Sequence, residues 1–406
     1  MTLSKNHIIK KSRFSSMLSG PLSLFVLAHF SHHLLMALAV PLMPFIRDDF
    51  GLDYTQSGLL ISAFTLSYGF SQLPAGWLAD HLGSSLLMTI GISGVALSGL
   101  LFGCSQTYSA MILALILMGV MGGGYHPTAP VLISRSIEPK NHGRALGIHL
   151  VGGSFSYFLA PLLGVAVAHI WGWRGSFIGL SIPIILFGIL FYVLLRQRTK
   201  AKYYPDSEVV CHNQGLYHSG RLRHLVVLLF LSTFTQAVIF STIAFIPLFL
   251  VDRFGAREEI AAALFSLIYF AGFWAGPLGG YLSDRLGTTS VIVTASFISG
   301  PVIYLINIVP YGLAFSVLML LIGTVMCMRG PATEAYIVSR TPEAKRSTLL
   351  GLYYFSGHEG GGVLTPVIGY FIDRLGFYST FTLIASTSMI VTLVCSVFLR
   401  PGNERP

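Results

Sequence analysis

Three histidines stand close together in an apolar stretch near the start of the chain, in the sequence HFSHH. His29, His32 and His33 are spaced by three and four residues, which places them along one broad face of a helix. Imidazole can bind a metal ion, hydrogen-bond in neutral form or line a polar cavity, and all three interpretations stay open. Because no carboxylate or cysteine lies nearby in the sequence, we predict no metal site and no cofactor.

His358 and Glu359 form an ionisable pair inside a second apolar stretch, LGLYYFSGHEGGGVLTP, which covers residues 350–366. Three glycines follow the pair and would let a neighbouring helix approach closely. Adjacent side chains on a helix point about 100° apart, so at most one of the two faces a cavity squarely. We predict that Glu359, with His149 as a second candidate, takes up and releases a proton during function.

Arg329 is a further charged residue within an apolar stretch. It lies about 26 Å along its expected helix, at a rise of about 1.5 Å per residue, and an unpaired guanidinium would be costly there. Two interpretations stay open. Glu359 could form an ion pair with Arg329, or the planar donor fork of Arg329 could bind an anionic substrate.

The candidates for contact with a substrate or a central cavity share two properties, because each is polar and each lies inside an apolar stretch. They are His29, His33, His126, Gln236, Arg329 and His358. His126 precedes Pro127, and Pro331 follows Arg329 closely in the second half of the chain. Each proline removes a backbone donor and favours a kink.

The chain as a whole has the composition of a membrane protein. Of its 406 residues, 53% are hydrophobic and 10% are charged, whereas soluble domains carry about 25% charged residues. The four cysteines are scattered and suggest neither a disulfide framework nor a zinc site. Residues 1–19 are basic, and the apolar stretch after them is too long for a signal-peptide core, so we expect a cytoplasmic tail.

Twelve stretches are long and apolar enough for the roughly 20 residues that a membrane-spanning helix needs. Six lie within 20–195 and six within 223–399, separated by a polar cytoplasmic linker at 196–222 and followed by a cytoplasmic tail at 400–406. The sequence therefore predicts an all-α, multi-pass membrane protein. The expected spans are 20–46, 56–79, 85–104, 107–133, 142–170, 174–195, 223–251, 259–282, 289–309, 311–337, 346–372 and 377–399.

Lys and Arg residues are distributed unevenly between the expected loops. With residues 1–19 in the cytoplasm, nineteen of the 25 lie on that side and five on the other, while the acidic residues divide evenly. An excess of Lys and Arg marks cytoplasmic loops, so both termini are predicted to be cytoplasmic, in a plasma membrane or bacterial inner membrane. Because the basic residues are spread over six short segments, we predict no nucleic-acid partner.

The two halves carry an internal repeat with an offset of 204 residues. GWLADHLGSS at 76–85 matches GYLSDRLGTT at 280–289, and Gly172 matches Gly376. Parallel six-helix repeats are a transporter architecture, in which the substrate site lies near the middle of the membrane between the halves. We therefore predict twelve transmembrane helices in two pseudo-symmetric six-helix halves.

The repeated loop resembles the signature of the major facilitator superfamily, G-x-L-x-D-x-x-G, and the resemblance covers residues from about 20 to about 400. It implies a transporter rather than an enzyme, in which the two halves rock around a central site. It also implies that these loops gate the movement, through Gly76, Asp80, Gly83, Gly280, Asp284, Arg285 and Gly287. The basic residues that usually follow the last glycine are replaced here by serines and threonines, which weakens any charged latch.

Within the superfamily, GGGYHPTAP at 122–130, with the glycine pair downstream, resembles the fosmidomycin-resistance-like exporters. Leu115 and Met118 occupy the positions where proton-coupled drug exporters usually carry an Arg four residues before a glycine. We predict a monomeric secondary transporter that exports a small organic solute, a drug or organic anion, in exchange for protons. The alternatives are an importer of an organic anion or metabolite, a transporter-like sensor and a membrane-embedded enzyme.

Overall fold

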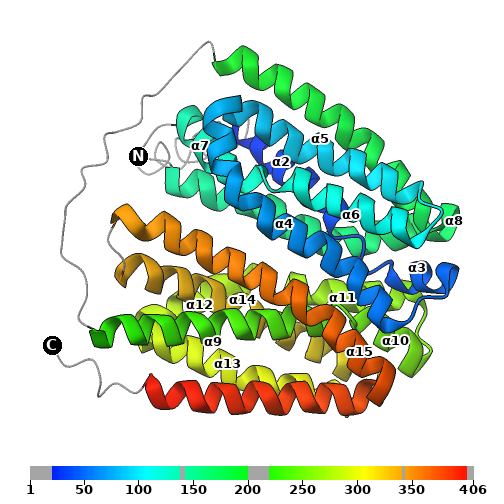
Figure 1. The fold of residues 1–406 in the computed structure, drawn as a ribbon, viewed down its shortest axis with the longest axis vertical. Coiled ribbons are helices and arrows are strands. Elements are labelled where there is room, and N and C mark those ends of the chain that lie inside the picture. The colour runs from blue at the N-terminus through cyan, green and yellow to red at the C-terminus, as the bar shows by residue number, and fades with distance from the viewer. Residues whose placement is uncertain (1–20, 138–141, 200–218, 341–342, 400–406) are drawn as a thin grey trace, which may run out of the picture.

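The computed structural model describes residues 21–137, 142–199, 219–340 and 343–399, and within these ranges the chain forms helices and no β-strand. Figure 1 shows two bundles of helices packed side by side, with α2 to α8 in one and α9 to α15 in the other. The predicted all-α membrane fold with twelve transmembrane helices is confirmed. The expected tails at 1–19 and 400–406 lie outside the described residues.

The first half contains six membrane-crossing segments. In chain order they are α2 (Pro21–Met36) continued by α3 (Met43–Phe50), α4 (Tyr54–Leu82), α5 (Ser84–Gly103), α6 (Tyr108–Gly122) continued by α7 (Tyr125–Ser136), and α8 (His142–Thr199), which carries two segments. The first segment is interrupted before Met43. Pro44 lies in the first turn of α3, where a backbone N–H group would have no partner within the helix. The fourth segment is interrupted at two glycines shortly before Pro127, where we expected a kink.

The second half repeats this plan with local differences. Its elements are α9 (Ser219–Ile243) continued by α10 (Ile246–Phe254), α11 (Glu258–Phe270) continued by α12 (Gly272–Leu286), α13 (Thr288–Leu305), α14 (Leu313–Arg340), and α15 (Glu343–Phe398), which carries two segments. In this half the second segment is interrupted, between α11 and α12. The fourth segment, α14, runs through Pro331 without a break.

Left-handed glycines show the internal repeat in the backbone itself. Glycine adopts a positive φ readily because it has no Cβ, so such residues mark obligatory turns. Three pairs share the offset of 204 residues and nearly the same φ: Gly51 and Gly255 (both 61°), Gly83 and Gly287 (88° and 85°), and Gly172 and Gly376 (69° and 74°). The chain therefore turns at equivalent points in both halves.

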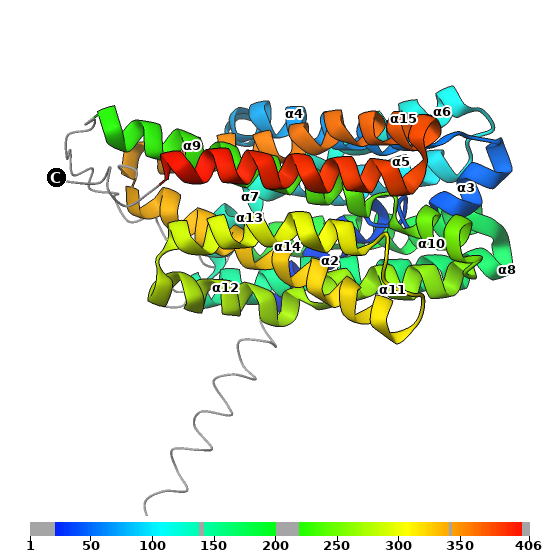
Figure 2. The ribbon, with the colours of Figure 1, turned by 90° about the horizontal axis from the view of Figure 1, so that it is seen from below.

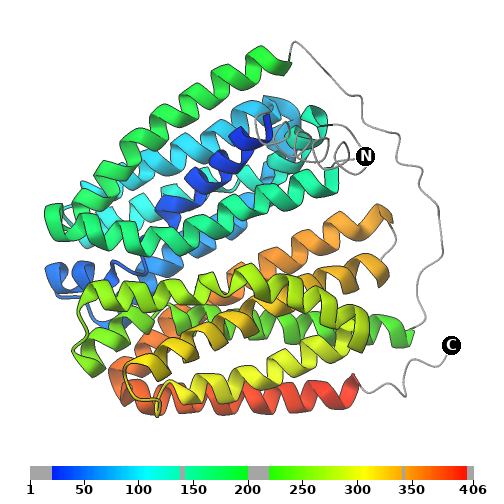
Figure 3. The ribbon, with the colours of Figure 1, turned by 180° about the vertical axis from the view of Figure 1, so that it is seen from behind.

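The halves meet at one end of the molecule and diverge toward the other. Figure 2 shows α3 beside α10 at the first end, which we call the α3–α10 end. Figures 1 and 3 show the bundles spreading apart toward the end where α9 begins and α15 ends, which we call the open end. The contacts between the halves are made chiefly by α4 against α15 and by α8 against α11.

Candidate functional site

The histidines of the first half form one cluster that three helices assemble. His29, His32 and His33 come from α2, His126 from α7 and His149 from α8. The ring of His29 stacks on that of His149 at 4.2 Å between centroids, and the ring of His33 lies 5.2 Å from that of His126. The three α2 histidines and His149 are buried. The structure thus brings together three of the six predicted cavity residues and one predicted proton-coupling residue.

Backbone carbonyls fix the orientation of these rings. Nδ1 of His29 lies 2.9 Å from the carbonyl oxygen of His149, and Nδ1 of His149 lies 3.1 Å from that of Phe25. Nδ1 of His32 lies 2.8 Å from the carbonyl oxygen of Gly91. Because a carbonyl oxygen only accepts, each Nδ1 carries the hydrogen and each Nε2 presents a lone pair.

Two buried tyrosines extend the cluster toward the second half. Tyr125 stacks on His32 with 4.2 Å between ring centroids. Tyr68 of α4 lies 6.3 Å from His32 on one side and 5.5 Å from His358 of α15 on the other. His358 is therefore the point at which the second half reaches the histidine cluster in this conformation.

The guanidinium of Arg329 is almost fully buried, with 2% of the residue exposed, and it lies against α9. It donates to the carbonyl oxygen and hydroxyl of Ser232, with 2.6 Å to Oγ, and to Oε1 of Gln236 at 3.3 Å. Gln236, another of the predicted cavity residues, is therefore a hydrogen-bond partner of Arg329. In this conformation α9 supplies neutral oxygens to the guanidinium within the second half, and the choice between an ion pair with Glu359 and an anionic substrate stays open.

Glu359 instead points at the first half. Its Oε1 is buried, has no hydrogen-bond partner, and lies so close to the backbone of Gly69 that a side chain there would overlap it. Gly69 belongs to α4, so the carboxyl group sits in the contact between α4 and α15. An unpaired carboxylate oxygen removed from water is costly, whereas the neutral acid is tolerated.

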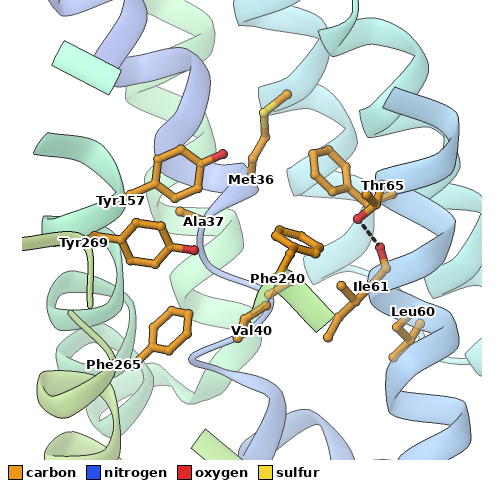
Figure 4. Close-up of a pocket in the computed structure, with 12 residues that line it drawn as sticks. Met36, Ala37, Val40, Leu60, Ile61, Thr65, Tyr157, Phe240, Phe265 and Tyr269 are labelled. Atoms are coloured by element: carbon orange, nitrogen blue, oxygen red, sulfur yellow. Dashed lines mark hydrogen bonds between the residues drawn. The ribbon is translucent and has the colours of Figure 1, made fainter. Parts of the chain in front are cut away.

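A pocket lies between the halves beside these groups. It is lined by apolar and aromatic side chains with few polar groups. Figure 4 shows Tyr157 and Tyr269 on one side and Phe240 between them and α4; the two tyrosine rings stack at 5.0 Å across the halves. The hydroxyl of Tyr157 lies 3.3 Å from Nδ1 of His33, so the pocket adjoins the histidine cluster.

Polar contacts close the α3–α10 end. Arg47 of α3 donates to both carboxylate oxygens of Asp252 of α10, with 2.7 Å from Nη2 to Oδ1, and the hydroxyl of Tyr54 donates to the same carboxylate at 2.5 Å. Asp252 raises the pKa of the Arg47 guanidinium further above its ordinary value. Each of these bonds crosses between the halves.

Two further contacts at this end occupy equivalent places in the repeat. Asp373 of α15 accepts the backbone N–H groups of Tyr54 and Thr55 at 3.0 and 2.8 Å, which caps the free donors at the start of α4. His169 of α8 lies 2.9 Å from Glu259 at the start of α11. Positions 169 and 373 differ by 204 residues, as do positions 55 and 259. Each half therefore forms a polar contact with the first turn of a helix in the other half.

The predicted gating loops lie toward the open end of the two bundles. Gly83 and Gly287 end α4 and α12 with positive φ, as the tight turn requires. Asp284 and Arg285 are exposed, and the Arg285 guanidinium lies 4.8 Å from the ring of Tyr281. The side chain of Asp80 and the surroundings of Gly76 are outside what the structure describes, and Gly280 has open space around it. The gating role of these loops stays a prediction.

Sequence reasoning missed several residues that the structure places at the site. Tyr157, Tyr68 and Ser232 carry no signal of their own, since hydroxylated residues are frequent in these helices. Asp252 and Asp373 lie in expected loop regions among other charges, and only the repeat offset between positions 169 and 373 could have singled one of them out.

Comparisons with known proteins agree with this architecture. The sequence model described as Major Facilitator Superfamily matches residues 25–265 and 225–406. The chain is 25% identical over 356 residues to the multidrug resistance protein MdtG of Proteus mirabilis (strain HI4320), covering 85% of this chain and 87% of that protein. It is 31% identical over 153 residues to a probable L-galactonate transporter of Escherichia coli (strain K12), covering 38% and 34%.

Solved structures share the fold across nearly the whole chain. A bacterial homologue of the human lysosomal transporter Spinster, in an inward-facing and unoccupied conformation, matches with a TM-score of 0.74 at 15% identity, covering 95% of this chain and 96% of that one. A POT family transporter in complex with 5-aminolevulinic acid matches with a TM-score of 0.79 at 13% identity and the same coverage. The chain therefore belongs to the Major Facilitator Superfamily and is a multi-pass membrane transporter.

Proposed function

We propose that this transporter exports a small organic solute, a drug or organic anion, in exchange for protons by alternating access. The observation that carries the proposal is the position of Glu359, whose buried Oε1 lies without a hydrogen-bond partner in the contact between α4 and α15. When the halves rock apart at this contact, the buried oxygen of the carboxyl group becomes accessible to water. Such a group releases a proton in one conformation and takes it up in the other.

The groups around Glu359 support its role as the coupling residue. His358 is its neighbour in the chain but turns toward Tyr68, and Arg329 is occupied by Ser232 and Gln236. The described residues thus offer no cation that would hold Glu359 ionised at this position. Its protonation is therefore set by the separation of the halves rather than by a fixed ion pair.

Two features support an organic solute and its export. The pocket between the halves is lined mainly by aliphatic and aromatic side chains, which suits an organic molecule with a large apolar part. Relatives that match most of the chain include multidrug resistance proteins, at 25 to 26% identity. The asymmetry of basic residues favours cytoplasmic termini in a bacterial inner membrane, and in that orientation the open end faces the cytoplasm, where an exporter loads its substrate.

Import of an organic anion or metabolite is the second candidate. It is favoured by the 31% identity to a probable L-galactonate transporter over 153 residues, and by Arg329, whose Nε has no acceptor among the described residues. A guanidinium binds carboxylate and phosphonate groups through paired donors. The two candidates differ in the direction of the proton gradient that drives accumulation.

Reconstituted protein distinguishes these candidates. A thermal-shift screen against small organic anions, sugars and antibiotics first identifies a ligand, because a ligand that binds only the folded state raises the melting temperature. Proteoliposomes with an acidic interior should then accumulate this ligand if protons are exchanged for it, whereas an importer driven by protons accumulates it when the exterior is acidic. Transport that ignores both gradients contradicts proton coupling.

Glu359→Gln tests the residue itself. The amide cannot release a proton, so we expect gradient-driven accumulation to be lost while exchange of labelled for unlabelled ligand across the membrane continues. Glu258→Gln, at the start of α11 and away from the α4–α15 contact, is the matched control and should keep both activities. Full gradient-driven transport by Glu359→Gln rules out Glu359 as the coupling residue.

A further inference from the structure

The histidine cluster of the first half has the properties of a metal site. One nitrogen from each of His29, His33 and His126 lies within 4.8 Å of the others. Three imidazoles form the protein ligand set of catalytic zinc sites, with Zn–N distances of about 2.0–2.1 Å. Around one tetrahedral ion the nitrogens would stand about 3.4 Å apart, so they need to converge by an ångström or so, which a small rotation of each ring provides.

The tautomer of His29 suits a ligand. Its Nδ1–H donates to the carbonyl oxygen of His149 at 2.9 Å, which leaves the lone pair of Nε2 free. Metal-binding histidines commonly donate their second ring nitrogen to a backbone carbonyl or carboxylate, which fixes the ring and raises its basicity as a ligand. The two nearby histidines His32 and His149 are oriented by carbonyls in the same way. The backbone therefore orients three of the five rings of the cluster.

The packing around His29 leaves room for its ring. Helix α8 presents Gly153 to it, and a Cβ at position 153 would lie 2.6 Å from Cε1 and 2.7 Å from Nε2 of His29. An alanine there would displace the ring from its present position. Position 153 must therefore lack a side chain if α8 is to pack this closely against Nε2 of His29, the nitrogen that would bind the ion.

The site connects to the pocket between the halves. His126 is only partly buried, and His33 lies 3.3 Å from the hydroxyl of Tyr157, which also lines the pocket. A fourth ligand can therefore arrive from the pocket. Because the three imidazoles are neutral, an ion of charge +2 would keep its full charge among them, and an anionic fourth ligand such as hydroxide or the carboxylate of a solute would reduce it.

We propose that His29, His33 and His126 bind one divalent transition-metal ion of the zinc class, with the fourth coordination position open to the pocket. Imidazole nitrogen suits Zn²⁺, Cu²⁺, Ni²⁺ and Fe²⁺, and disfavours Mg²⁺ and Ca²⁺, which prefer oxygen ligands. The alternative is that the histidines only pack and hydrogen-bond. That alternative explains the stacked rings of His29 and His149, but it does not require three ring nitrogens to lie within 4.8 Å of one another.

Zinc and cobalt binding to the purified full-length protein, without a histidine tag, tests the proposal. Zn²⁺ affinity is measured by calorimetry, and Co²⁺ reports the ligand geometry through its visible absorption. We expect one Zn²⁺ per chain, and a loss of affinity greater than about 100-fold in His29→Gln, His33→Gln and His126→Gln, since loss of an outer-shell partner alone costs about 10- to 100-fold. Gly153→Ala should weaken binding while it keeps all three ligands.

Two matched controls separate this site from surface binding. His81→Gln removes an exposed histidine whose Nδ1 also bonds a carbonyl, that of Trp77 at 2.8 Å, and it should leave Zn²⁺ affinity unchanged. His169→Gln disrupts a second group of possible ligands, which consists of His169, Glu258 and Glu259. The proposal is overturned if the wild type binds neither ion, if His169→Gln abolishes binding, or if the three ligand variants bind as the wild type does while their metal-free melting temperatures confirm that they fold.

Discussion

Asp252→Asn should shift the conformational equilibrium toward a state in which the α3–α10 end is open. In the present conformation Asp252 accepts from Arg47 and from Tyr54, and both bonds cross between the halves. The side chains of Arg47 and Asp252 are 15% and 24% exposed, so water screens their attraction only in part. Asparagine keeps one oxygen acceptor at this position but removes the negative charge.

The size of the shift follows from this geometry. Hydrogen bonds to charged groups contribute about 1.5–3 kcal/mol, whereas fully exposed ion pairs contribute about 0–1 kcal/mol. Because the side chains of this pair are only partly exposed, we expect the contact to stabilise the closed α3–α10 end by about 1.5 kcal/mol. Every 1.4 kcal/mol is about a factor of ten, so the ratio of closed to open α3–α10 ends should fall about tenfold.

Distances between spin labels measure this ratio directly. Labels at Gln106 in the first half and Arg253 in the second, both exposed, report the separation of the halves at the α3–α10 end in a background without native cysteines. Asp48→Asn is the matched control, because Asp48 accepts from the same Arg47 at 3.1 Å but belongs to the same half. An equal shift in Asp48→Asn and Asp252→Asn, or none in either, would refute the role of this contact as a latch.

Three further changes have defined outcomes. In Gly58→Ala the new Cβ would lie 2.9 Å from the backbone of Pro366, so the halves should separate at the α3–α10 end by the same spin-label measure, whereas Gly179→Ala, with open space around it, should change nothing. Arg174 and Trp173 hold the pKa of the Asp49 carboxyl below its usual value; the stability that this contact contributes is present above about pH 4 and is lost as pH falls through the folded-state pKa. The difference in melting temperature between wild type and Asp49→Asn corresponds to about 1 kcal/mol or less, because the side chains are 30% and 44% exposed and water screens them, and it should therefore shrink as the pH is lowered below about 4. Arg329→Lys replaces a fork that meets Ser232 and Gln236 with a single ammonium, and it should lower the melting temperature by the equivalent of about 1–3 kcal/mol, while Arg285→Lys at an exposed site should not.

The sequence was informative wherever one position alone determines the backbone. A glycine that follows a repeated Asp-containing loop must turn the chain, and Gly83 and Gly287 do so with almost identical φ. Gly172 and Gly376, matched by the same offset, separate the paired segments within α8 and α15. The apolar composition of the stretches likewise suffices to predict helices, because the membrane leaves few other ways to satisfy backbone hydrogen bonds.

The candidate site was less predictable, because side-chain contacts depend on how each helix is rotated about its axis. Spacing placed His29 and His33 on one face of α2, but it could not indicate that α7 and α8 bring His126 and His149 to the same face. The same uncertainty left the partner of Arg329 open between Glu359 and a substrate. Both residues lie within the second half, yet Arg329 turns to α9 and Glu359 turns to α4.

The contact between α4 and α15 combines two kinds of chemistry along its length, and this combination fits a surface that must separate repeatedly. Near its middle, small residues bring the backbones together: Ser62 donates to the carbonyl of Gly362 at 2.6 Å, and Gly58 meets Pro366. Such contacts bury little side-chain area, so opening them exposes little apolar surface to water.

At the α3–α10 end, Asp373 accepts two backbone N–H groups and the hydroxyl of Thr55 at the first turn of α4, so this closure depends only in part on a side chain of α4. The equivalent contact in the other half, between His169 and Glu259, instead uses side chains on both partners. Substitution of Glu259 can therefore remove the second contact entirely, whereas substitution of Thr55 removes only the hydroxyl bond and leaves the two backbone bonds to Asp373. The repeat thus conserves the position of the closure but not its chemistry, and the two halves are expected to respond differently to mutation at equivalent positions.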